Sequence, residues 1–421
     1  MVVATSPALK AIGETYPVAD FKRRPSTVSE LTRAKAFLSE HLANFRELPW
    51  NVQIELGDGI QYIVDCKAQA MRAVDESGTE PDCSIAIAAA DFLLVATGGI
   101  DPRTLIFFHR IKMTGLPVAI TKFLDAVGNR KVASTMRTDK ALPQPTTDYE
   151  LAKAQIREFG YCMIKDALSP SEVRTLRERL EEQAAAEREN GLALRGTATK
   201  VGVPPIQPVW NLANKGQVFI DLLSHPLVDE FGIDFLGEYF LISSYCSKIA
   251  HPGCAPQPIH TDQIGMHPPV THMSLGLNIF FFLDDFVEAN GATRLVPGSH
   301  LPENNIAPDN LFSIEGTIPA EAPAGTAFIF DMRLWHCTGP NKTNKDRRAV
   351  FMLMARSWIR TVENHTLSIR PEVLEKMPDR LKTLFGFRTT SAAGGVDGAV
   401  EGEIANRDFA SRVGVLRPKN P

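Results

Sequence analysis

The sequence lacks the features that mark secreted, membrane-spanning and nucleic-acid-binding proteins. Its 421 residues include six cysteines but no CxxC pair, which argues against a disulfide framework or a zinc ribbon. No basic start followed by an apolar run marks a signal peptide, and the longest apolar stretch, Ile85–Val95, is far shorter than the about 20 residues that cross a bilayer. Lys plus Arg total 45 against 49 Asp plus Glu, so no excess of positive charge is available to hold a phosphate backbone. We therefore expect a cytoplasmic protein with free thiols, no membrane span and no nucleic-acid partner.

The chain length and a proline-rich polar segment predict two domains. The chain is too long for one hydrophobic core, and at 44% apolar residues it can build more than one. Two prolines, threonines and charges interrupt any apolar period between Arg137 and Tyr149. We predict a domain at 1–137, a linker at 138–148 and a second domain at 149–421, with its core at about 150–360 and a C-terminal extension at 361–421. The sequence does not indicate an oligomeric state.

The first domain reads as a small α+β unit. Residues Ile60–Val64 and Ser84–Ala88 alternate apolar and polar positions, which predicts strands, and Phe92–Thr97 is predicted to be a further strand. Four apolar residues then recur at helical spacing and predict a helix with one buried stripe: Leu116, Ile120, Leu124 and Val127.

Part of this domain resembles a known family. Residues 84–127, with Asp91, Gly99, Asp101 and Gly115 as signposts, resemble the sterol carrier protein 2 family, and the resemblance covers roughly residues 29 to 130. It implies a five-stranded sheet with helices around a lipid or acyl-chain tunnel. Composition alone favours a solid core instead, because apolar stripes usually mark cores.

The second domain begins with helices and continues as strands. Ser169, Pro170 and Glu172 combine an N-cap, a proline at the first helical position and a capping box, and predict a helix from Pro170 towards Glu187. Another helix is predicted from Pro226 to near Gly237. From Tyr239 to Trp358 the composition predicts mostly strands.

Three residues in this β-rich part form a candidate metal site. On an extended backbone, residues two apart point to one side, so His260 and Asp262 can face one point in space. His336 can complete the set from the end of a single β-rich run that starts near Gly325. Two imidazoles and one carboxylate leave coordination positions open, which suits non-haem Fe(II) acting on O2. Zinc is the rival metal, although structural zinc sites are usually closed by four protein ligands.

Two further segments resemble a family that uses such a site. Residues 290–300, NGATRLVPGSH, and 336–341, HCTGPN, resemble the phytanoyl-CoA dioxygenase family, and the match spans about residues 150 to 360. The resemblance implies a double-stranded β-helix, a jelly-roll or cupin-like fold, with flanking helices. It also implies an Fe(II)- and 2-oxoglutarate-dependent dioxygenase that consumes O2, with His260, Asp262 and His336 as the iron ligands.

The resemblance also implies residues that hold 2-oxoglutarate. Arg347, eleven positions beyond His336, would bind the distal carboxylate, and an arginine fork suits that role because it binds carboxylates bidentately and stays charged. Arg348 points to the opposite face of the strand, so only one of the two can be this anchor. The remaining expected contacts are Thr338, Gln257, and Asn278 and Phe280 on a strand at Leu275–Leu283.

The predicted function is oxidation of an unactivated C–H bond in a small substrate, hydrophobic or acyl-linked in character. Two alternatives remain at this level. One is a lipid-binding or transfer protein whose oxygenase half is silent. The other is a non-oxidative metalloenzyme on a related β-fold.

Overall fold

The computed structural model describes residues 26–388 except 58, 75–79, 99, 101, 108–109, 129–139, 194–205, 264–265, 267–268, 306–310 and 312. Gly99, Asp101, the first residues of the predicted linker and residues 389–421 of the predicted extension therefore lie outside the described residues. The chain forms two compact units: residues 1–134 make up most of the first, and most of the residues from Thr135 onward make up the second. The exact bounds of the linker at 138–148 stay a prediction.

The first unit is a mixed five-stranded sheet with helices. Its strands run in the order β3-β2-β1-β4-β5, in which β1 and β4 are parallel and the other pairs antiparallel. Its elements are α2 (Val28–Glu40), η1 (Leu42–Phe45), β1 (Asn51–Glu55), β2 (Gln61–Asp65), β3 (Ala70–Ala73), β4 (Cys83–Ala86), α3 (Ala89–Ala96), α4 (Pro102–Phe107), β5 (Lys112–Gly115) and α5 (Pro117–Val127).

Most predicted elements of this unit are confirmed. Strands β2 and β4 match the two alternating runs, and α5 matches the helix predicted from its apolar spacing. The strand predicted at Phe92–Thr97 is wrong, because these residues lie in α3, where Phe92 and Val95, three apart, are both buried on one helical face. Apolar side chains fill one core between sheet and helices, with Phe45 stacked on Phe123 at 4.6 Å. The lipid tunnel stays a prediction.

The second unit contains two antiparallel sheets. The larger has six strands in the order β6-β12-β9-β14-β8-β7, and the smaller has three in the order β11-β10-β13. Its elements are α6 (Tyr149–Phe159), β6 (Tyr161–Ile164), α7 (Pro170–Glu189), β7 (Ile206–Val209), η2 (Leu212–Asn214), α8 (Gln217–Leu223), α9 (Pro226–Leu236), β8 (Leu241–Ala250), β9 (Gly276–Phe282), β10 (Thr293–Leu295), β11 (Ile318–Pro319), β12 (Ala327–Asp331), β13 (His336–Thr338), β14 (Arg347–Ala355), α10 (His365–Ser368), α11 (Pro371–Lys376) and α12 (Asp379–Leu384).

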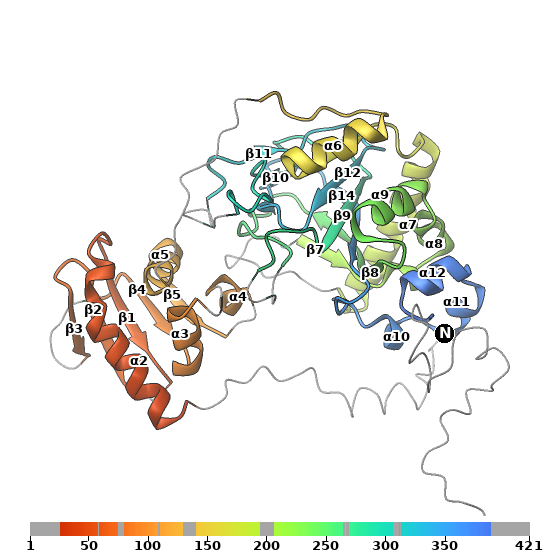
Figure 1. Cartoon of the computed structure of the whole chain (residues 1–421). Helices are drawn as coiled ribbons and strands as arrows, with labels where there is room; N and C mark the ends of the chain where they lie inside the picture. The colour runs from red at the N-terminus through yellow and green to blue at the C-terminus, as the bar shows by residue number, and fades with distance from the viewer. Residues whose placement is uncertain are drawn as a thin grey trace, which may run out of the picture. The chain divides into compact units, whose positions relative to one another are not determined.

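The six-stranded sheet, whose strands β8, β9, β12 and β14 are labelled in Figure 1, has two faces with different side chains. On one face, Ile279, Phe281, Val350 and Met352 pack with side chains of α6, α7, α8, α9 and α12 in a single core. The alternate residues of the same strands point to the other face, which we call the interior face. The interior face carries Asn278, Phe280 and Phe282 on β9, Phe328 and Phe330 on β12, and Arg347, Ala349 and Phe351 on β14.

The predicted helices of this unit are confirmed, and one predicted strand is wrong. Helix α7 starts with the capping box of Ser169 and Glu172, and α9 begins at Pro226. The run from Gly325 to His336 is not a single strand: β12 ends at Asp331, and β13 starts at His336 in the smaller sheet. The break has a cause, because the Asp331 carboxylate accepts hydrogen bonds from the backbone and guanidinium of Arg333 and closes a turn.

The sheets agree with the mainly-β fold predicted for this unit, while the exact jelly-roll topology stays a prediction. Over the parts of the chain that the structure describes, every helix is too short or too polar to cross a bilayer.

Candidate metal centre

The structure brings His260, Asp262 and His336 together. One ligand atom from each lies within 4.8 Å of the other two. The Nε2 atom of His336 is 3.5 Å from one Asp262 oxygen, and Nε2 of His260 is 3.8 Å from the other. The segment around His260 runs antiparallel to the start of β13 at His336, and the two backbones exchange hydrogen bonds of 2.9 Å. This pairing is what brings residues 74 to 76 positions apart to one point.

Backbone and side-chain hydrogen bonds orient the three groups. Nδ1 of His260 donates to the Pro258 carbonyl at 2.8 Å, and Nδ1 of His336 donates to the Leu334 carbonyl at 2.9 Å. Both rings are thereby held in the tautomer that leaves Nε2 free to bind a metal. Asn278 donates to the Asp262 carboxylate at 2.7 Å. The donor set is therefore fixed in direction before any ion binds.

The electrostatics favour the protonation states that a divalent cation needs. Burial lowers the pKa of His260 to about 4, with the charge of His336 as a second cause, and burial also lowers the pKa of His336. Burial raises the pKa of Asp262, but the two histidines, Lys248 and the hydrogen bond from Asn278 outweigh it, so that the net shift is downward. At neutral pH the site thus presents two neutral imidazoles and one carboxylate.

The two neighbouring arginines of β14 have different surroundings. Arg347 lies on the interior face, is 1% exposed and stacks its guanidinium 4.5 Å from the centre of the Phe286 ring. Its Nε and Nη2 atoms are buried without a hydrogen-bond partner. Arg348 points the other way and forms ion pairs with Glu181, Asp284 and Asp346.

The other predicted contacts also lie around the interior. The Thr338 hydroxyl donates to Oε1 of Gln257 at 2.8 Å, and the Gln257 backbone N–H donates to the Thr338 carbonyl. Phe280 packs edge-on against Phe330 and Phe351. Asn278 touches the Asp262 carboxylate, whereas its own Oδ1 is buried without a partner. The structure thus places all eight predicted site residues around one region of the second unit.

Sequence reasoning missed two residues here. Thr293 of β10 is paired with Thr338 and shares its face, and the Thr293 hydroxyl is buried without a partner. Lys248 of β8 contributes to the lowered pKa of all three triad residues. The period of two along β8 and β10 could have indicated that both point inward, but only the register with the neighbouring strands identifies the interior face.

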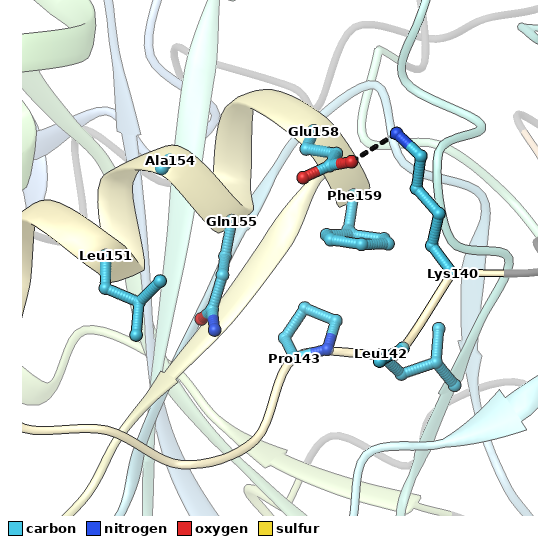
Figure 2. A pocket seen from close by; sticks show the side chains of 9 residues that line it. Lys140, Leu142, Pro143, Leu151, Ala154, Gln155, Glu158 and Phe159 are labelled. Atoms are coloured by element: carbon cyan, nitrogen blue, oxygen red, sulfur yellow. Dashed lines mark hydrogen bonds and ion pairs between the residues drawn. The ribbon is translucent and has the colours of Figure 1, made fainter.

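A separate groove of about 290 Å³ lies between residues 140–143 and α6 (Figure 2). Leu142, Pro143, Leu151 and Phe159 form its apolar wall, and Lys140 and Glu158 make an ion pair at its rim. None of the predicted site residues lines this groove.

Comparison with known families decides the identity of both units. The family model described as phytanoyl-CoA dioxygenase matches residues 156–349, and the model of the SCP-2 sterol transfer family matches residues 32–123. The "Dioxygenase af480" of Aspergillus fumigatus is 30% identical over 254 residues, which cover 58% of this chain and 78% of that protein. The chain belongs to the phytanoyl-CoA dioxygenase family. It is thus a non-haem, 2-oxoglutarate-dependent dioxygenase with an SCP-2 domain in its first unit.

Further relatives and solved structures are similar to part of the chain. The "Dioxygenase trt7" of Aspergillus terreus is 28% identical, covering 59% of this chain and 87% of that one. AviO1 from Streptomyces viridochromogenes has 21% identity and a TM-score of 0.43, covering 52% of this chain and all of that one. The non-haem α-ketoglutarate-dependent carbocyclase SnoK of nogalamycin biosynthesis has 20% identity and a TM-score of 0.43. The similarity covers 54% of this chain and 95% of SnoK.

Proposed function

We propose that this phytanoyl-CoA dioxygenase family member binds Fe(II) through His260, Asp262 and His336 and oxidises an unactivated C–H bond of an apolar substrate. The observation that carries the proposal is the pairing of this three-residue donor set with the unpartnered, buried guanidinium of Arg347 on the same interior. A closed zinc site would need a fourth protein ligand, and the structure groups only three such residues in the parts of the chain that it describes.

The triad and its hydrogen-bond partners would hold the metal ion. The two Nε2 atoms and the Asp262 carboxylate would hold the ion, and the hydrogen bonds to Pro258 and Leu334 keep the rings facing it. Bound Fe(II) would supply the redox chemistry by which O2 oxidises both 2-oxoglutarate and the substrate. Asn278 keeps the Asp262 carboxylate turned towards the ion by donating to it.

Arg347 would bind the distal carboxylate of 2-oxoglutarate. Burial lowers the pKa of Arg347 to about 10, so the guanidinium is still charged at neutral pH. A buried cation with unpaired N–H groups is costly unless an anion joins it, and a carboxylate provides a bidentate partner. Thr338, the last residue of β13, is hydrogen-bonded to Gln257, and both would border the same cosubstrate.

The part of the interior face that would contact the substrate is an apolar wall of aromatic side chains. Phe280, Phe328, Phe330 and Phe351 pack against one another on the interior face and are all buried. Such a wall excludes water from the reacting C–H bond and favours a hydrocarbon body. The SCP-2 domain of the first unit supports the same choice of a hydrophobic or acyl-linked substrate.

The direct test is turnover of the cosubstrate. Purified enzyme with Fe(II), 2-oxoglutarate and O2 should form succinate, faster with a productive substrate than without one, and His336→Ala should form none. A wild-type enzyme that stays folded, binds Fe(II) and forms no succinate with any member of a lipid and acyl-substrate panel would contradict the proposal.

A further inference from the structure

Lys248 places a second cation on the interior of the sheet. Its strand partner on β14 is Ala349, which lies on the interior face with Arg347 and Phe351. The Nζ atom lies 4.8 Å from the centre of the Phe351 ring and 5.7 Å from that of Phe280. Phe280 is two residues from Asn278, which holds the Asp262 carboxylate. The ammonium therefore lies towards the metal-binding end of the interior.

This ammonium has aromatic neighbours but no counter-ion of its own. Among the residues that the structure describes, none makes an ion pair or hydrogen bond with Nζ of Lys248, and the side chain is half-buried. Asp262 cannot serve as its partner once that carboxylate is committed to a metal ion. A cation kept in such surroundings is best explained by an anion that arrives with a ligand.

A charge count indicates which ligand brings that anion. A divalent ion and the Asp262 carboxylate together leave one positive charge, and Arg347 adds a second. The two carboxylates of 2-oxoglutarate balance these two charges. The charge of Lys248 is then unmatched, and only the primary substrate remains to balance it.

We propose that Lys248 binds a carboxylate of the primary substrate, which makes the substrate an amphipathic acid whose apolar body lies against Phe280 and Phe351. The inference rests on the proposed function and deepens it, because it names the polar group of the substrate. The cation fixes one end of the molecule, so Lys248 selects which C–H bond faces the metal.

The test measures ligand binding at the metal and needs no turnover. Anaerobic enzyme carrying Fe(II) and 2-oxoglutarate is titrated with straight-chain acids from butanoate to dodecanoate, and with the alcohol of the same length as the neutral match. The readout is the change in the visible absorption of the Fe(II)–2-oxoglutarate complex. Variants are Lys248→Met, which keeps the apolar stem, Lys248→Arg, which keeps the charge, and Lys345→Met, an exposed lysine, as the matched control.

In wild type, the best acid should produce half of the maximal absorption change at a concentration about tenfold or more below that of the alcohol of the same length, as expected for one charge-assisted contact. Lys248→Met should abolish this preference, while Lys248→Arg and Lys345→Met keep it. The concentration of 2-oxoglutarate that half-saturates the band should stay within about twofold of wild type in all three variants, because Arg347 and the metal hold that molecule.

Two results would overturn the inference. A tenfold or greater loss of 2-oxoglutarate affinity in Lys248→Met would make the cosubstrate the source of the carboxylate. An acid preference that is absent in wild type, or unchanged in Lys248→Met, would show that Lys248 holds no substrate anion. If the wild type gives no absorption band at all, the proposed function fails instead, which is a distinguishable outcome.

Discussion

At the scale of single residues, Arg347 and Arg348 are adjacent in sequence, but their side chains have different roles. We expect Arg347→Gln to raise the 2-oxoglutarate concentration needed for half-maximal succinate formation far more than Arg348→Gln. Removing one partner of a desolvated charge pair costs about 2 to 5 kcal/mol. A partly exposed cation shared among several carboxylates is worth about 1 kcal/mol or less. Titration of 2-oxoglutarate in the two variants ranks them, and the reverse order would move the anchor to Arg348.

Part of the site could be predicted from the sequence because it follows from local backbone geometry. A spacing of two on an extended backbone is enough to pair His260 with Asp262, and alternation along one strand separates Arg347 from Arg348. The inward position of Lys248 and the contact of Asn278 with Asp262 could not be predicted in this way. Each depends on which side chains lie across the sheet, and that register is set by packing between strands far apart in sequence.

At the scale of elements, Glu363 fastens the segment after β14 to the large sheet. Its carboxylate accepts hydrogen bonds from the backbone N–H groups of Tyr245 and Asn211 and from the Ser244 hydroxyl. Glu363→Ala should lower the free energy of unfolding by about 1–3 kcal/mol, because buried N–H groups lose their acceptor. The exposed Glu375→Ala is the control and should change it by less than about 0.5 kcal/mol. Equal losses in the two variants, measured by urea unfolding, would remove this role from Glu363.

The same carboxylate gives a pH dependence with a defined sign. Burial raises the pKa of Glu363 in the folded protein, so the folded state binds its proton more tightly than the unfolded state. Its contribution to stability therefore declines as the pH rises from the unfolded pKa, about 4.3, through the folded value. The free energy of unfolding of Glu363→Gln should therefore rise relative to that of wild type as the pH increases over this range. Urea unfolding at several pH values measures it, and a difference that does not change with pH would contradict this role.

Elements with strong local signals were predicted correctly, and those without were not. The capping box of Ser169 and Glu172 fixes the start of α7 from residues within one turn. Phe92–Thr97 is a short apolar run whose composition suits a strand as well as a helix, and its packing in the core of the first unit decides the matter. The turn that splits β12 from β13 depends on the buried pair of Asp331 and Arg333, which composition does not reveal.

At the scale of the whole molecule, the two units should be separable. Each unit has its own buried core, and about 130 residues can support one. A fragment of residues 1–137 should fold alone and bind a fluorescent fatty-acid probe saturably in the micromolar range, about −8 kcal/mol. Residues 138–421 should still form succinate. A folded fragment that binds no probe would leave the first unit as a docking or dimerisation module.

The metal centre is the central claim, and its most direct measurement is the visible absorption of the anaerobic enzyme with Fe(II) and 2-oxoglutarate. Wild type should give a charge-transfer band, which His260→Ala, Asp262→Ala and His336→Ala should each abolish. His272→Ala, an exposed histidine next to the motif, should retain it. All four variants should keep the wild-type circular dichroism spectrum, since an open catalytic site is carried by a scaffold with its own core. A band that persists unchanged in Asp262→Ala, or a wild-type enzyme that shows none, would contradict the assignment of these three residues as the iron ligands.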